Sequence, residues 1–110
     1  MEKNGKSLAI VIGENGSCSN GQLAELLQGL QALEEPSIQL IFTTEGVSLV
    51  THDSPVLAQL QALELKGVPI LTCSTCLSHA GLRDQVAVGR VAGMTRIMTA
   101  MQSADQVAAI

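Results

Sequence analysis

The residues best suited to chemistry lie between Cys73 and His79, where two thiols and an imidazole follow the spacing C-x-x-C-x-x-H. Residues 68–72 form an apolar run that predicts a strand, and Cys73 stands at its end. In an open α/β sheet, ligands bind beyond the carboxyl ends of the strands, so Cys73 is expected in a functional position. Cys76 lies about one helical turn further on, near enough to hydrogen-bond to Cys73 or to attack a sulfur species on it.

Ser74 and Thr75 follow Cys73 and are expected to open a short helix over residues 76–82. Unpaired backbone N–H groups at that point would contact the sulfur of Cys73 and stabilise its thiolate, the nucleophilic form of cysteine. A C-x-x-C pair at a strand-to-helix junction favours thiol chemistry. The alternative is packing, because free cysteine is among the most often buried residue types and behaves as a small hydrophobe. The strand-end location argues more strongly for Cys73 than for Cys76.

Two further residues are accessory candidates. His79 completes a set of zinc-type ligands, but a fourth ligand would have to come from Cys18 or His52, and only if the fold brought them together. We therefore predict no metal and no cofactor, with His79 on the short helix. Cys18 lies in a loop over residues 13–21 that lacks both the P-loop ending and the dinucleotide fingerprint. Two placements are open for Cys18: beside Cys73 at the same edge of the sheet, or as an exposed thiol without a role.

Apolar segments and amphipathic segments alternate along nearly the whole chain, which predicts a three-layer α/β sandwich with a mostly parallel sheet of about five strands and helices on both faces. The 110 residues fit a single domain over 1–110. Residues 43–51 are expected to continue extended, with Gly46 as a bend or bulge. The expected strands are 6–12, 38–42, 68–72, 86–91 and an edge strand over 106–110. The expected helices are 23–33, 54–67, 76–82 and 94–102.

Composition excludes several classes of protein. The net charge is -4 and Phe42 is the only aromatic residue, which opposes phosphate attraction and base stacking and so excludes a nucleic-acid partner. The apolar run at residues 8–12 is far shorter than the roughly 20 residues of a membrane span. Three cysteines do not suggest a disulfide framework, so we expect reduced thiols and a cytoplasmic location. A mean hydropathy of +0.33 favours apolar surface buried between subunits.

Several stretches together resemble the DsrE-like family of small sulfur-transfer proteins, and most closely its YedF-type branch, which is linked to selenium metabolism. The resemblance covers most of the chain and rests on residues 42–47, residues 65–68, the Cys73-Ser74-Thr75-Cys76-Leu77 motif with Gly81-Leu82 behind it, and Val88-Gly89 followed by Met94.

The resemblance implies a five-stranded α/β domain, assembly into a homotrimer or hexamer, and a cysteine that accepts sulfur as a persulfide and passes it to a partner protein. The family's sulfur-carrying cysteine precedes a glycine by eight residues, as Cys73 precedes Gly81, so this role is carried over to Cys73. Cys76 matches a second cysteine of the YedF-type branch and would resolve or shelter the persulfide. The partners implied are sulfur donor and acceptor proteins, including a small sulfur-carrier protein on another chain.

Two other functions remain open from the residues. The first is a noncatalytic oligomeric binding module whose cysteines pack or hold a metal. The second is a thioredoxin-like reductase that uses the same C-x-x-C, although the tryptophan usual beside that motif is absent. The leading interpretation is a cytoplasmic sulfurtransferase-like carrier in which Cys73 holds a persulfide, with sulfur and selenium not distinguished.

Overall fold

The computed structural model describes residues 7–13, 20–31 and 37–109. Five strands form one sheet in the order β4-β3-β2-β1-β5, and each neighbouring pair is parallel. The mostly parallel five-stranded sheet expected from the sequence is confirmed, and β5 does lie at an edge. The strands are β1 (Leu8–Ile12), β2 (Ile38–Phe42), β3 (Ile70–Cys73), β4 (Arg90–Ala92) and β5 (Gln106–Ala109).

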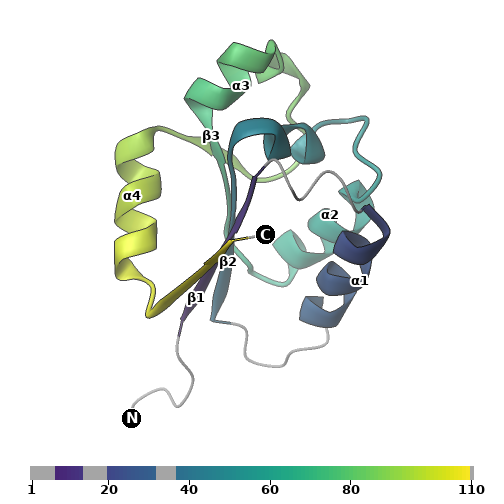
Figure 1. The fold of residues 1–110 in the computed structure, drawn as a ribbon. Helices are drawn as coiled ribbons and strands as arrows, with labels where there is room; N and C mark the ends of the chain where they lie inside the picture. Colours follow the sequence, from purple (N-terminus) through teal and green to yellow (C-terminus); the bar gives the residue numbers. More distant parts are fainter. Residues whose placement is uncertain (1–6, 14–19, 32–36, 110) are drawn as a thin grey trace.

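Helices cover both faces of this sheet, as the three-layer prediction requires. Figure 1 shows α1 and α2 on one face and α4 on the other, while α3 lies beyond the carboxyl end of β3. No helix of the described segments is long and apolar enough to cross a membrane. The α-helices are α1 (Asn20–Gln31), α2 (Leu57–Leu65), α3 (Ser74–Ala80) and α4 (Met94–Ser103), and the 3-10 helices are η2 (Thr44–Val50) and η3 (Arg83–Gln85).

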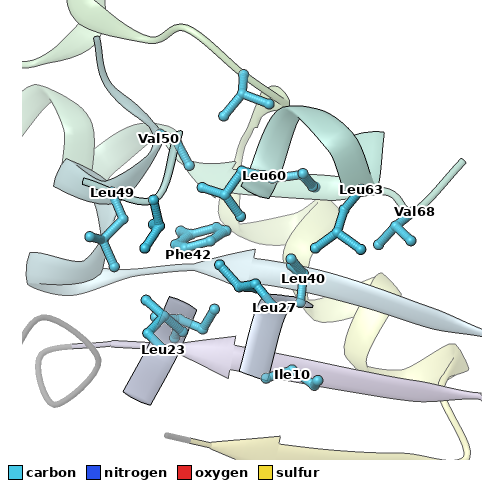
Figure 2. Close-up of a cluster of buried hydrophobic side chains, with 14 of the residues drawn as sticks. Ile10, Leu23, Leu27, Leu40, Phe42, Leu49, Val50, Leu60, Leu63 and Val68 are labelled. Carbon is cyan, nitrogen blue, oxygen red and sulfur yellow. The ribbon is translucent and has the colours of Figure 1, made fainter. Parts of the chain in front are cut away.

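The larger core lies between the sheet and helices α1 and α2. Alternate strand residues point to this side because successive side chains of a strand face opposite ways. Leucines recur every three or four residues along α1, so they form one apolar stripe that packs onto the strands. Phe42 is fully buried among them, and Figure 2 shows it surrounded by aliphatic side chains of α1, α2 and η2. The labelled members are Ile10, Leu23, Leu27, Leu40, Phe42, Leu49, Val50, Leu60, Leu63 and Val68.

The smaller core lies on the opposite face, under α4. Ile97 of α4 is fully buried against small and medium side chains of the sheet. Cys73 belongs to this cluster rather than to the larger core, because it alternates with Thr72 along β3. The buried members are Ala9, Ile41, Leu71, Cys73, Ala92 and Ile97.

One expected element is wrong, and a second is shorter than expected. Residues 43–51 do not continue extended, because Thr44–Val50 forms the 3-10 helix η2. Its turns close by hydrogen bonds from the Gly46 N–H to the Thr43 carbonyl and from the Thr51 N–H to the Ser48 carbonyl. The β-branched content favours a strand, but β2 has already ended. The helical turn buries Val47 and places Leu49 and Val50 in the larger core.

Residues 86–91 also differ from expectation, since only residues 90–92 pair with β3 as strand β4. Val86 instead forms an isolated antiparallel bridge with Thr51, and the Ala87 N–H donates to the Val50 carbonyl. These backbone partners come from the end of η2, so this part of the chain is tied to η2 rather than to the sheet.

Candidate functional site

Cys73 is the last residue of β3 and the N-cap of α3, so the predicted strand-end position is confirmed. Its Sγ accepts a hydrogen bond from the Cys76 N–H at 3.5 Å. The side chain is fully buried in the smaller core, against Ile97 and its neighbours. Cys73 therefore combines a position at the carboxyl edge of the sheet with an apolar environment that excludes solvent.

Cys76 lies one turn along α3 and is partly exposed. Its Sγ accepts a hydrogen bond from the Thr44 N–H at 3.2 Å. Thr44 is the only non-glycine residue of the described chain with a positive φ, at 49°, a conformation that L-residues other than glycine rarely adopt. Thr44 thus holds its backbone donor toward Cys76 in a left-handed conformation that must be stabilised by its surroundings.

The close packing of η2 onto the end of β1 supplies that support. A Cβ placed on Gly46 would lie 2.3 Å from the Ile12 carbonyl oxygen, so only glycine fits there. A Cβ on Gly13 would lie 3.1 Å from the Thr44 Oγ1. The Thr44 hydroxyl also donates to the Thr43 carbonyl at 2.7 Å. The ends of β1, β2 and β3 therefore meet at this edge, and the donor from one strand end reaches the thiol that follows another.

The electrostatic surroundings disfavour a thiolate at Cys76. Burial raises the pKa of the Cys76 thiol above its ordinary value, as do a side-chain hydrogen bond and charge repulsion from Cys73. The Thr44 N–H acts in the opposite direction, because a donor stabilises the anionic sulfur.

The other predicted site residues are distributed differently. Ser74 is partly buried and Thr75 exposed in the first turn of α3, whereas His79 is exposed in its last turn. No three histidine, cysteine or acidic side chains of the described segments gather as metal ligands, so the structure does not bring His79 together with Cys73 and Cys76 as such a group. Cys18 lies outside the described residues.

The comparisons with known proteins decide the family. The family model described as the DsrE/DsrF-like family matches residues 6–108, which is nearly the whole chain. The chain belongs to the DsrE/DsrF-like family. The resemblance read from the sequence is therefore confirmed at the family level. A comparison with curated proteins gave no significant match.

Solved structures share the DsrE-like fold. The structure of the YchN protein of E. coli matches with a TM-score of 0.79 at 19% sequence identity, covering 96% of this chain and 99% of that protein. A protein of unknown function from Methanobacterium thermoautotrophicum matches with a TM-score of 0.73 at 23% sequence identity, covering 96% of this chain and 98% of that protein. A conserved protein of unknown function from Bacteroides thetaiotaomicron matches with a TM-score of 0.74 at 18% sequence identity, covering 96% of this chain and 95% of that protein. At these identities the likeness establishes the fold alone.

Thr44 is the site residue that sequence reasoning missed. The extended conformation expected for residues 43–51 gives no reason to place the Thr44 N–H beside Cys76, which lies 32 positions further along the chain. The one available signal was that residues 42–47 are among the stretches that resemble the DsrE-like family. That signal marks the segment, but the donor role follows only from the left-handed turn at Thr44.

Proposed function

We propose that this protein is a sulfur carrier that holds sulfane sulfur as a persulfide on Cys73 and passes it to an acceptor thiol, with Cys76 resolving or sheltering that persulfide. Membership of the DsrE/DsrF-like family, which is associated with sulfur relay, supports the proposal. The observation that carries it is the pair of interacting thiols at the carboxyl edge of the sheet, with Cys73 ending β3.

The chemistry needs no cofactor. The Cys73 thiolate attacks the outer sulfur of a donor persulfide, an S–S bond forms at Cys73, and the donor leaves as its thiolate. An acceptor thiolate then attacks the outer sulfur of the Cys73 persulfide, and Cys73 leaves as a thiolate. Each step exchanges one sulfur between two thiols with no net oxidation. The same steps apply to selenium in place of the transferred sulfur.

The proposal includes protein partners and self-association. The partners are a sulfur donor and an acceptor, which the small sulfur-carrier proteins would fit. A homotrimer or hexamer is supported by large apolar side chains at the surface, since Met94, Met98 and Val107 are each about half exposed. Val107 pairs with Ala9 and so faces the α4 side of the sheet. Light scattering should give a trimeric or hexameric mass, and a monomeric mass would contradict this part of the proposal.

A second candidate function is a noncatalytic oligomeric binding module. The complete burial of Cys73 among apolar side chains favours it, because this is how a packing cysteine is placed. In such a module neither Cys73 nor Cys76 would react with a persulfide in the folded protein.

Sulfur loading separates these two functions. The reduced, metal-free protein is incubated with glutathione persulfide, and its intact mass is then measured without reductant. A carrier gains one sulfur and a thiol removes it, whereas Cys73→Ser retains no sulfur once the donor has been removed. An unchanged mass on the folded protein would instead support the binding module.

A further inference from the structure

The two thiols of the pair differ in their access to solvent. Cys73 is 0% exposed, and the side chains around it belong to the smaller core. Cys76 packs against the edge of the same core but is partly exposed, and it accepts a hydrogen bond from the exposed residue Thr44. A donor persulfide carried by another molecule can therefore reach Cys76 without a change in the fold, whereas Cys73 is covered.

The pair is also connected for transfer between its members. The Cys76 N–H donates to the Cys73 Sγ, and the two side chains hydrogen-bond to each other. Both residues lie on one short segment that begins at the end of β3. A sulfur on Cys76 would therefore lie next to Cys73 without any diffusion step.

From these observations we infer that sulfur enters and leaves the carrier through Cys76, and that Cys73 is loaded by transfer from Cys76. This inference rests on the proposed function, and it replaces direct exchange at Cys73 by exchange through Cys76. Cys76 would be the exchange thiol at the surface, and Cys73 the sheltered storage site.

Each step balances. The Cys76 thiolate attacks the outer sulfur of the donor persulfide, and the donor leaves as its thiolate. The Cys73 thiolate then attacks the outer sulfur of the Cys76 persulfide, so that the persulfide moves to Cys73 and Cys76 leaves as a thiolate. Release to an acceptor repeats these two exchanges in reverse order. No oxidant or reductant is consumed.

The backbone of Thr44 has a part in this route as a positioning residue. Its N–H points at the Cys76 Sγ, where negative charge develops whenever Cys76 attacks or leaves. A hydrogen bond to sulfur strengthens when the sulfur becomes anionic. The left-handed turn at Thr44 therefore places a donor at the exchange thiol rather than at the storage thiol.

The test compares single variants in the full chain. Wild type, Cys76→Ser and Cys73→Ser are treated with glutathione persulfide, quenched with an alkylating reagent at set times and digested with trypsin. Both site cysteines lie on the tryptic peptide over residues 67–83, while Cys18 lies on the peptide over residues 7–66, so Cys18 is read separately. Far-UV circular dichroism checks that each variant is folded.

We expect the wild type to gain one sulfur on peptide 67–83 and Cys73→Ser to load Cys76 at the same initial rate. Cys76→Ser should load Cys73 at least about tenfold more slowly, because the remaining thiol is covered. Loading of Cys76→Ser at the wild-type rate would overturn the inference and leave the proposed function standing. A folded wild type that gains no sulfur would overturn the proposed function itself, and the inference with it.

A second measurement applies to the unmodified protein and does not depend on a variant that folds. Native wild type is exposed briefly to iodoacetamide, and fragmentation of peptide 67–83 locates the label. The inference requires Cys76 to be alkylated at least about tenfold faster than Cys73. Equal rates, or faster labelling of Cys73, would overturn it.

Discussion

Replacing Gly46 by alanine should destabilise the protein strongly, because the added Cβ would collide with backbone. The new atom would lie 2.3 Å from the Ile12 carbonyl oxygen and 3.0 Å from that of Gly13. Contacts below 3.0 Å are essentially never observed, so η2 must move away from β1 by at least about 0.7 Å. Ile12 is fully buried in a central strand and hydrogen-bonds through its carbonyl to the Thr43 N–H, so it cannot easily give way.

Overpacking of this kind costs about 1–3 kcal/mol, and we expect the upper end because neither partner is a flexible side chain. For a domain of this size, about 3 kcal/mol lowers the melting temperature by about 10 °C or more. With a urea m-value of about 1–3 kcal/mol/M, the same loss shifts the denaturation midpoint by about 1–3 M. Far-UV circular dichroism is the suitable probe, because the chain contains no tryptophan or tyrosine.

Gly29→Ala is the matched control. Gly29 lies inside α1, and a Cβ there would meet nothing within 4 Å. Alanine in place of glycine in a helix interior should therefore raise stability by about 0.8–1.0 kcal/mol. If Gly46→Ala unfolds at the wild-type urea concentration while Gly29→Ala shows its expected gain, the close packing of η2 on β1 is not what holds Thr44 in place.

Three further outcomes are expected. Gly89→Ala should lose about 2–3 kcal/mol in urea denaturation, since φ is 80° and the Cβ would lie 2.7 Å from Ile70 Cγ2; a wild-type midpoint would contradict this. Thr72→Val should gain about 1–3 kcal/mol, because Oγ1 is buried and unpaired among the described residues; a lower melting temperature would show an unseen partner. Alkylation of Cys76 should accelerate as pH rises beyond 9.0, because its pKa is raised above that ordinary value.

The raised pKa of Cys76 also predicts how the stability of the protein changes with pH. Because the folded-state pKa of Cys76 is raised, the folded protein favours the neutral thiol. The neutral Cys76 thiol therefore contributes to the free energy of unfolding. This contribution is fully present at pH values below the unfolded-state pKa and is lost as pH rises through the folded-state pKa. Wild type should therefore lose stability at alkaline pH by more than Cys76→Ser does, and equal losses in the two proteins would refute this assignment.

Much of the fold could be predicted because its signals are local. The aliphatic runs at β1 and β2, together with the leucine spacing of α1, indicate buried strands and an amphipathic helix without reference to any distant residue. The strand-end position of Cys73 follows from the same pattern. The segment over residues 43–51 could not be predicted in this way, since its β-branched residues suit a strand and only the packing against β1 selects η2.

The sequence by itself determined the alternation of strands and helices, and it placed a C-x-x-C pair where one strand gives way to a helix. Only the tertiary structure decided which thiol is covered, because the smaller core around Cys73 combines residues of all of β1, β2, β3, β4 and α4. It also decided that Thr44 donates to Cys76 across 32 positions of the chain. The physical reason is that the carboxyl ends of parallel strands come together only when the sheet forms. The residues next to the cysteines in sequence therefore predict neither the burial of Cys73 nor the hydrogen bond from Thr44 to Cys76.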